Sequence, residues 1–205
     1  LNDLRAYGVS TDYMIVEKGA VTNFCLALAE KDTGGRSFLR QHGNCRPLSL
    51  TDLNEDAIRS AKVLHLSAMS PLCVRAAEIM RESGGIVVID ADEFDMQIDK
   101  YISLIDVFIS SKQYFVSLYP NEHYERGLKE ICSRGPRVAI TTLGKKGCAG
   151  FDGNEYFTLP VIDLPVIDST GAGDVFHGAY IHGMLKGWKA KQCARFATAV
   201  ASAKC

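Results

Sequence analysis

The sequence predicts an α/β fold, with a doubly wound and mostly parallel sheet, helices on both of its faces and a small β-sheet lid. Three observations carry this prediction. From residue 52 onward, segments with helical spacing alternate with short strand-like segments. Those strand-like segments are nearly all apolar, as strands are when helices cover both faces of a sheet. Before residue 52, strand-like segments follow one another directly, which indicates a separate antiparallel sheet.

The N-terminal part contains three predicted strands, at residues 13–17, 22–29 and 36–41. Turn-forming residues separate them, notably the Asp-Thr-Gly-Gly run at 32–35. Consecutive short strands of this kind pair in an antiparallel way. We therefore expect residues 11–43 to form a β lid within one α/β domain that spans residues 1–205.

The rest of the chain alternates helix and strand. Helix-like segments at 53–61, 71–85 and 124–136 each precede an apolar strand segment. The predicted strands are VLHL at 63–66, IVVID at 86–90, DVFIS at 106–110 and VAITT at 138–142. Parallel sheets of this type bind ligands beyond the carboxyl ends of their strands. The polar residues at the ends of strand-like segments are Ser67, Asp90, Ser110, Thr142 and Asp168.

Composition and charge narrow the possible partners and the compartment. The formal net charge of −1 provides no basic surface, so we expect neither nucleic acid nor a membrane as a partner. The apolar runs are too short to span a bilayer, and no signal-peptide pattern opens the sequence. The seven cysteines are scattered and lack both C-x-x-C pairs and zinc-type spacing. This usage is typical of reduced thiols, and it predicts a cytoplasmic protein.

The segment DSTGAGDVFHG at residues 168–178 is the strongest chemical signal. It lies between a β-like segment, 155–168, and a helical one, 175–187. Small residues at a helix start allow an anion such as a phosphate to approach the free amide groups there. Asp174 follows directly, where a carboxylate can accept a proton from a hydroxyl that attacks phosphorus.

The residues of this glycine turn also allow other interpretations. Asp174 could simply stabilise the helix start, where acidic side chains are favoured. A Rossmann dinucleotide site is disfavoured because Phe176 stands where its third glycine belongs. The GKKG run at 144–147 lacks the spacing and the Ser/Thr of a Walker A loop. The signatures of protein kinases are also absent from the sequence.

Three segments together resemble one family, the ribokinase-like (phosphofructokinase B) carbohydrate kinases. DSTGAGDVF resembles the family's second signature, D-[ST]-x-G-A-G-D-x-[FY]. TTLGKKG at 141–147 is similar to its nucleotide-strand motif, T-x-G-x-x-G, and residues 8–43 resemble its lid. The resemblance covers essentially all 205 residues. Family members normally have a further strand and a glycine-pair motif before the lid and a closing segment after the last helix, so we expect the chain to be incomplete at both ends.

The resemblance implies a role for each matching residue. Asp174 would be the general base on the acceptor hydroxyl. The anion hole for the γ-phosphoryl group would be formed by the amides of Gly171, Ala172 and Gly173. The triphosphate side of the nucleotide site would be lined by Thr142, Gly144 and Gly147. A monovalent cation such as K⁺ would be bound by Asp168 and the carbonyl of Thr170. For Asp168 and Thr142 the alternatives are a turn former and an ordinary strand residue.

Two departures from the family pattern concern the metal and the substrate. Ser111 and Tyr114 stand where many members carry the Asn and Glu of an N-x-x-E motif, which organises the magnesium-bound phosphates. Asp90 and Asp92 occupy the place of a D-x-N-x-R motif that lacks its arginine here. Asp90, Asp92 and Ser111 are therefore weak candidates for substrate or metal contacts, and Asp92 is better explained as a solvated loop acid.

The resemblance implies an ATP-dependent phosphotransferase, with Mg²⁺ as cofactor, that acts on a hydroxyl of a small sugar or sugar acid. Two alternatives stay open, a nucleoside kinase of the same family and a catalytically idle protein that binds sugar or nucleotide as a regulator. A nicotinamide-dependent dehydrogenase fits the fold class but lacks the fingerprint. In some family members the lid sheets of two protomers pair, which implies a homodimer through the lid.

Overall fold

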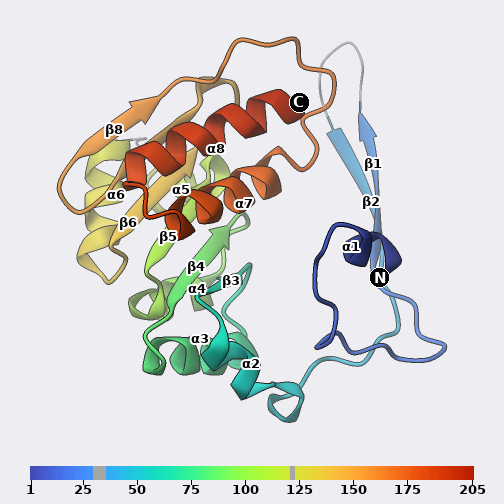
Figure 1. Ribbon diagram of the computed structural model, residues 1–205. Coiled ribbons are helices and arrows are strands. Elements are labelled where there is room, and N and C mark those ends of the chain that lie inside the picture. The colour runs from blue at the N-terminus through green and yellow to red at the C-terminus, as the bar shows by residue number, and fades with distance from the viewer. Residues whose placement is uncertain (30–35, 121–122) are drawn as a thin grey trace. The chain divides into compact units, whose positions relative to one another are not determined.

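A computed structural model describes residues 1–29, 36–120 and 123–205. It divides the chain into two compact units, Leu1–Asn54 and Glu55–Cys205 (Figure 1). Each unit is described by itself below.

The described secondary structure comprises strands, α-helices and short 3₁₀ segments. The strands are β1 Phe24–Ala29, β2 Arg36–Gln41, β3 Val63–Leu66, β4 Ile86–Ala91, β5 Val107–Ser111, β6 Val138–Thr142, β7 Cys148–Phe151 and β8 Tyr156–Leu159. The α-helices are α1 Asn2–Ala6, α2 Glu55–Ser60, α3 Pro71–Glu82, α4 Met96–Lys100, α5 Lys112–Leu118, α6 Tyr124–Ser133, α7 Ala172–Leu185 and α8 Ala190–Lys204. The 3₁₀ segments are η1 Leu50–Asp52, η2 Ile102–Leu104 and η3 Gly144–Lys146. None of the helices in the described ranges is both long and apolar enough to cross a membrane.

The N-terminal unit contains a two-stranded sheet. β1 and β2 pair antiparallel, with Leu26 opposite Leu39, as the sequence predicts. The prediction of a strand at residues 13–17 is wrong, because these residues form turns and irregular backbone with exposed apolar side chains. Apolar and β-branched residues favour a strand only where a neighbouring strand supplies hydrogen bonds and packing. The turn expected at residues 32–35 lies outside the described residues.

The second unit is built on a six-stranded sheet in the order β3-β4-β5-β6-β7-β8. β3 to β6 are parallel to one another, and β7 and β8 extend the sheet antiparallel. Figure 1 shows α7 and α8 lying side by side over one face of this sheet, with α3 and α6 beyond its other face. The predicted mostly parallel sheet with helices on both faces is confirmed.

Two apolar cores hold the helices to the sheet. Successive residues of a strand alternate between them, so Phe108 of β5 lies in one core and Ile109 in the other. The first core packs the sheet against helices of the parallel crossovers, and its members include Ala77 of α3, Phe115 of α5 and Leu128 of α6. The second core packs the opposite face against the two last helices, and its members include Phe176, Tyr180, Ala194 and Ala197. Burial on both faces explains why these strands are nearly all apolar.

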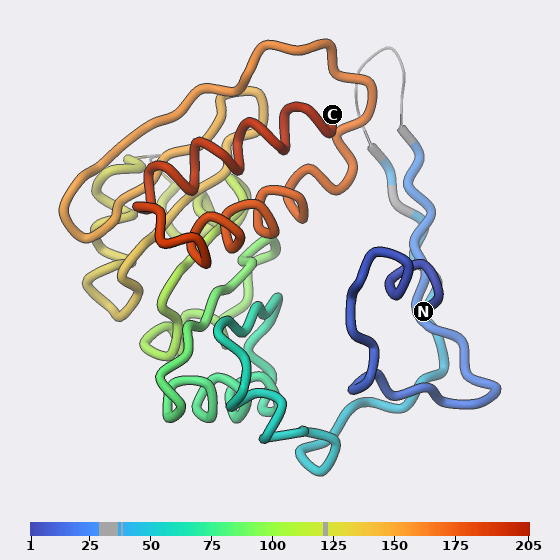
Figure 2. Tube along the Cα trace, viewed as in Figure 1, coloured from blue at the N-terminus to red at the C-terminus, as the bar shows by residue number. Residues whose placement is uncertain are grey.

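Glycines stand directly after the ends of two helices. α3 ends before Gly84, whose φ of +76° only glycine adopts easily, and α6 ends before Gly135. The β-like segment 155–168 forms a strand only at β8. Its remainder contains Pro160 and Pro165, which lack amide hydrogens for a sheet. In Figure 2 this irregular stretch, in orange, leads from β8 to the start of α7, and the amides of residues 167 and 168 donate to the Cys205 carbonyl.

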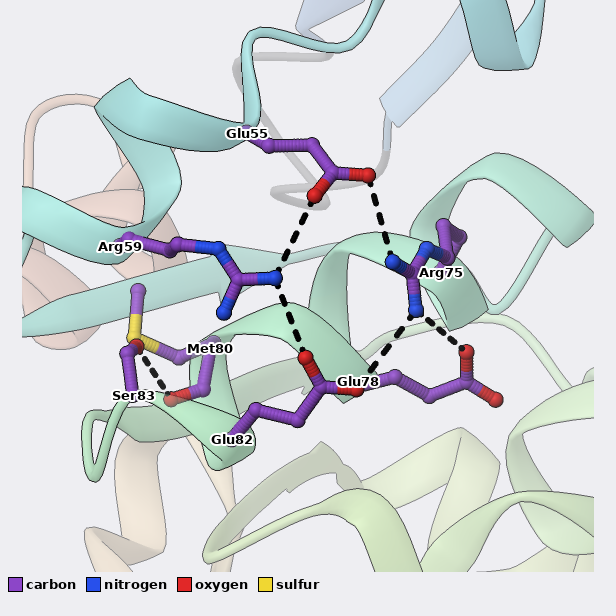
Figure 3. Close-up of polar contacts among 7 residues, drawn as sticks. All are labelled: Glu55, Arg59, Arg75, Glu78, Met80, Glu82 and Ser83. Carbon is purple, nitrogen blue, oxygen red and sulfur yellow. Dashed lines mark hydrogen bonds and ion pairs between the residues drawn. The ribbon is translucent and has the colours of Figure 1, made fainter.

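An ion-pair network joins α2 to α3 at the surface (Figure 3). The Glu55 carboxylate accepts hydrogen bonds from Arg59 and Arg75, which also pair with Glu82; Arg75 reaches Glu78 as well. The Arg75 and Arg59 guanidinium groups hold the pKa of Glu55 below its usual value. Because all five side chains are substantially exposed, salt screens these pairs and their effect on stability is small. The network contains none of the predicted site residues.

Tyr114 provides a test of the first core. Its side chain is 1% exposed, and its ring contacts Phe94 and Phe108, but its hydroxyl has no hydrogen-bond partner among the described residues. We predict that Tyr114→Phe leaves the free energy of unfolding unchanged or raises it by up to about 1 kcal/mol, because a buried unsatisfied hydroxyl is removed. Urea unfolding measures the change. Tyr114→Leu, which loses the ring contacts, should be clearly less stable than either. A loss above about 1 kcal/mol in the phenylalanine variant would show that the hydroxyl has a partner.

Candidate active site

The glycine turn lies at the start of α7, as predicted. Gly171 precedes the helix with φ +75°, a left-handed conformation that glycine adopts without steric cost. The Asp168 carboxylate accepts a hydrogen bond of 2.8 Å from the Thr170 amide, which closes the turn before it. Among the described residues, no side chain caps this helix end. The Ala172 amide donates to the Ser169 carbonyl at 3.2 Å, and the next amides of α7 lie at a helix start without intrahelical partners, on a surface made of small residues.

Asp174 occupies the first turn of α7, and its side chain is exposed. A Cβ built on Gly171 would lie 3.6 Å from Asp174 Oδ2, so the carboxylate stands over the glycine turn. A Cβ built on Gly173 would meet no described heavy atom within 4 Å. The turn thus leaves open space beside an acid at the positive end of a 14-residue helix, an arrangement suited to binding an anion.

The predicted nucleotide residues lie at the connection between β6 and β7. Thr142 ends β6, and its hydroxyl donates to the Ser110 carbonyl at 3.3 Å. Gly144 and Gly147 both have positive φ, +56° and +83°. At Gly147 an added Cβ would lie within 2 Å of the Leu159 carbonyl oxygen, because the turn passes close to the end of β8. Local geometry therefore explains both glycines, and a contact with nucleotide stays a prediction.

Ser111 and Asp92 are connected at the end of β5. The Ser111 hydroxyl donates to the Asp92 carbonyl at 2.8 Å and accepts from the Tyr114 amide at 3.1 Å, which makes Ser111 the N-cap of α5. The Asp92 side chain is exposed. Ser111 and Thr142 are register partners on β5 and β6, so these two predicted residues do lie side by side.

Asp90 belongs to a polar contact around the buried His177 that sequence reasoning missed, with Asp90 partly buried and His65 exposed. His177, 4% exposed on α7, places its Nε2 3.2 Å from Asp90 Oδ1 and its Nδ1 3.2 Å from His65 Nε2. Partial burial lowers the pKa of His65, the His177 ring adds to this effect, and the carboxylates of Asp90 and Asp174 oppose it. From the sequence, His65 looked like an ordinary strand residue. The spacing of three residues between Asp174 and His177 on one helix was the only available signal.

The described side chains give little support for metal or thiol chemistry. In the described part of the chain, no three His, Cys, Asp or Glu side chains gather as a metal site. All seven cysteines are free. Burial raises the pKa of Cys132 and Cys148 to about 11, so neither is a thiolate at neutral pH. The predicted residues that the fold brings together are Asp174 with the glycine turn, Asp168 with Thr170, and Ser111 with Thr142 and the Asp92 carbonyl.

Known proteins are similar to this chain over most of its length. An uncharacterized sugar kinase of Archaeoglobus fulgidus is 26% identical over 216 residues, which cover 100% of this chain and 84% of the relative. A nucleoside kinase of Methanothermobacter thermautotrophicus is 26% identical over 206 residues and matches 97% of this chain, which spans only 65% of that protein. A solved structure from E. coli, described as a ribokinase II in complex with ATP and Mg²⁺, superposes with a TM-score of 0.83 at 23% identity and covers 98% of this chain and 70% of its own.

The family model of the pfkB carbohydrate kinases matches residues 1–205, the whole length of the sequence. Its match includes the glycine turn, Asp174 and the β6–β7 connection. The chain belongs to the pfkB family of carbohydrate kinases.

Proposed function

We propose that this chain transfers the γ-phosphoryl group of ATP to a hydroxyl of a small sugar or sugar acid. One observation carries the proposal: the exposed Asp174 carboxylate stands beside an open glycine turn at the positive end of α7. The amides of Gly171, Ala172 and Gly173 would stabilise the charge on the transferring group, and Asp174 would accept the proton of the attacking hydroxyl. The free cysteines further support a cytoplasmic location.

The described residues fit the expected cations, Mg²⁺ and K⁺, to different extents. The E. coli structure holds ATP and Mg²⁺, which supports both here. The described residues offer no cluster of metal ligands, and this suits an ion held mainly by phosphate oxygens and water. Bound in this way, Mg²⁺ would neutralise phosphate charge. For a monovalent cation, the Asp168 side chain is engaged by the Thr170 amide and its carbonyl by Lys204 Nζ at 2.8 Å, so K⁺ dependence is a separate question for experiment.

The test is ATP consumption by the full-length protein with a panel of sugars, sugar acids and nucleosides. Mg²⁺ is present throughout, and K⁺ is varied. Turnover on a sugar or sugar acid, with a phosphorylated product seen by mass spectrometry, supports the proposal. Preferred turnover on a nucleoside favours the alternative suggested by the similarity to a nucleoside kinase. Tight binding of sugar or nucleotide without turnover favours a non-catalytic regulator.

The variant Gly173→Ala tests the effect of the glycine turn on thermal stability separately from its effect on kcat. The added methyl group meets no described heavy atom, and alanine is favoured over glycine inside a helix by up to about 1 kcal/mol. We therefore predict unchanged or higher thermal stability. The same methyl group projects into the open space where a phosphate would approach, so we expect kcat to fall about 10-fold or more. Calorimetry and the ATP assay measure the two effects. Gly178→Ala, farther along α7 and equally open, is the control for helix stability alone.

A further inference from the structure

Three polar side chains connect α7 to two strands of the sheet. His177 of α7 lies between Asp90, next to last on β4, and His65, next to last on β3. The two contacts, Nε2 to Asp90 Oδ1 and Nδ1 to His65 Nε2, are both 3.2 Å. His177 is 4% exposed, and the Asp90 side chain is 23% exposed. Both ring nitrogens of a buried histidine are thus engaged, so the orientation of this ring is fixed.

The protons in this chain of contacts can be assigned from its chemistry. An ionised carboxylate only accepts hydrogen bonds, so His177 Nε2 must donate to Asp90. In a neutral imidazole the other nitrogen is then an acceptor, and His65 must donate to it from Nε2. With both rings neutral, every group between Asp90 and His65 is satisfied. The two hydrogen bonds therefore run in one direction, from His65 to His177 and from His177 to Asp90.

The glycine turn is held by backbone hydrogen bonds and by the Asp168–Thr170 contact, and its own side chains add little to the placement of Asp174. Gly171 and Gly173 have no side chains, and no described side chain caps the helix. Phe176 and Tyr180 bury the helix against the second core, but apolar packing has little directional preference. His177 lies three residues after Asp174, so the two side chains are neighbours on the helix surface. Hydrogen bonds at His177 would resist rotation of the first helical turn of α7, which carries Asp174.

We propose that His177, held between Asp90 and His65, is a positioning residue that fixes the first turns of α7 and thereby the direction of the Asp174 carboxylate. The importance of that direction rests on the proposed function, in which Asp174 must meet the attacking hydroxyl. The fixing of the turn itself does not rest on the proposed function, and it can be measured without substrate.

Amide hydrogen exchange of the full chain tests the fixing of the turn. His177→Leu removes both hydrogen bonds, and His177→Gln keeps an amide group that can donate to Asp90. We expect the amides of residues 175–178 to exchange about 10-fold faster in the leucine variant, and close to wild type in the glutamine variant. The amides of residues 181–185 should be unchanged in both. His182→Gln, at an exposed histidine farther along α7 whose ring contacts Trp188 and Phe196, is the control and should leave exchange at residues 175–178 unchanged.

Steady-state kinetics tests the consequence for catalysis. In His177→Leu we expect kcat to fall about 10-fold while the KM values for ATP and sugar stay within about 3-fold, with recovery in His177→Gln. Unchanged exchange at residues 175–178, or faster exchange along the whole helix, would overturn the inference. So would a normal kcat in the leucine variant of an active enzyme, and that result would leave the proposed function intact. Local exchange as expected in a protein without turnover would refute the function and support the fixing of the turn.

Discussion

Asp174→Asn is expected to lower kcat for phosphoryl transfer by about 10³-fold, within the range that a positioned general base contributes. Asparagine preserves the size of the side chain and its place in the first turn of α7, but it cannot take the proton of the attacking hydroxyl. The amides of the glycine turn are unchanged, so we expect the Kd for ATP to stay within about 3-fold of wild type. A coupled ATP assay and calorimetric titration of nucleotide measure the two quantities.

The control for this variant is Asp163→Asn, which removes an exposed acid in the irregular segment before α7. It should leave kcat unchanged while altering net charge in the same way. If Asp174→Asn retained turnover within about 10-fold of wild type, the carboxylate would be no base. The acid would then be explained by its favourable position at a helix start. That was the alternative left open by the residues alone.

Much of the second unit could be predicted from local sequence, because its signals are local. An apolar run marks each of β3, β4, β5 and β6, a glycine helix stop precedes β4 and β6, and burial on both faces requires the apolar composition. The failures involve pairing between distant segments. Residues 13–17 have strand-like composition but no place in a sheet, and β8 stops at Leu159 although the β-like pattern continues to residue 168. In that segment, Pro160, Pro165 and the hydrogen bonds to the Cys205 carbonyl determine the path of the chain.

The candidate site likewise contains residues that the local sequence identifies and residues that it does not. The glycine turn and Asp174 are contiguous in sequence, so a short motif locates them. His65 and His177 are 112 residues apart, and no periodicity indicates that their rings meet. Ser111 is an intermediate case: a serine directly before a helical segment is a recognisable N-cap, and the structure gives it that structural role. Residues whose roles depend on tertiary contacts were therefore missed or assigned only weakly.

Gly147→Ala should have the largest effect on stability of the glycine substitutions in the two motifs. The backbone at this position has φ +83° and ψ −126°, a conformation that residues with a Cβ rarely adopt and that costs an L-residue about 1–3 kcal/mol. The new Cβ would also lie within 2 Å of the Leu159 carbonyl oxygen, so the turn or the end of β8 must move. We predict a loss of about 3 kcal/mol or more in the free energy of unfolding, and a Tm lower by roughly 6–12 °C.

Gly144→Ala is the matched control, because it lies in the same turn, also has positive φ, and would place its Cβ where no described heavy atom lies within 4 Å. Its cost should be limited to the backbone term of about 1 kcal/mol. The difference between the two variants in a thermal melt therefore measures the close approach to Leu159 together with the rarer backbone conformation of Gly147. If Gly147→Ala were no less stable than Gly144→Ala, the two strands would yield easily at this point. If it folds with a lower Tm and also binds ATP more weakly than Gly144→Ala, the close packing of the β6–β7 turn against β8 shapes the nucleotide site as well as the fold.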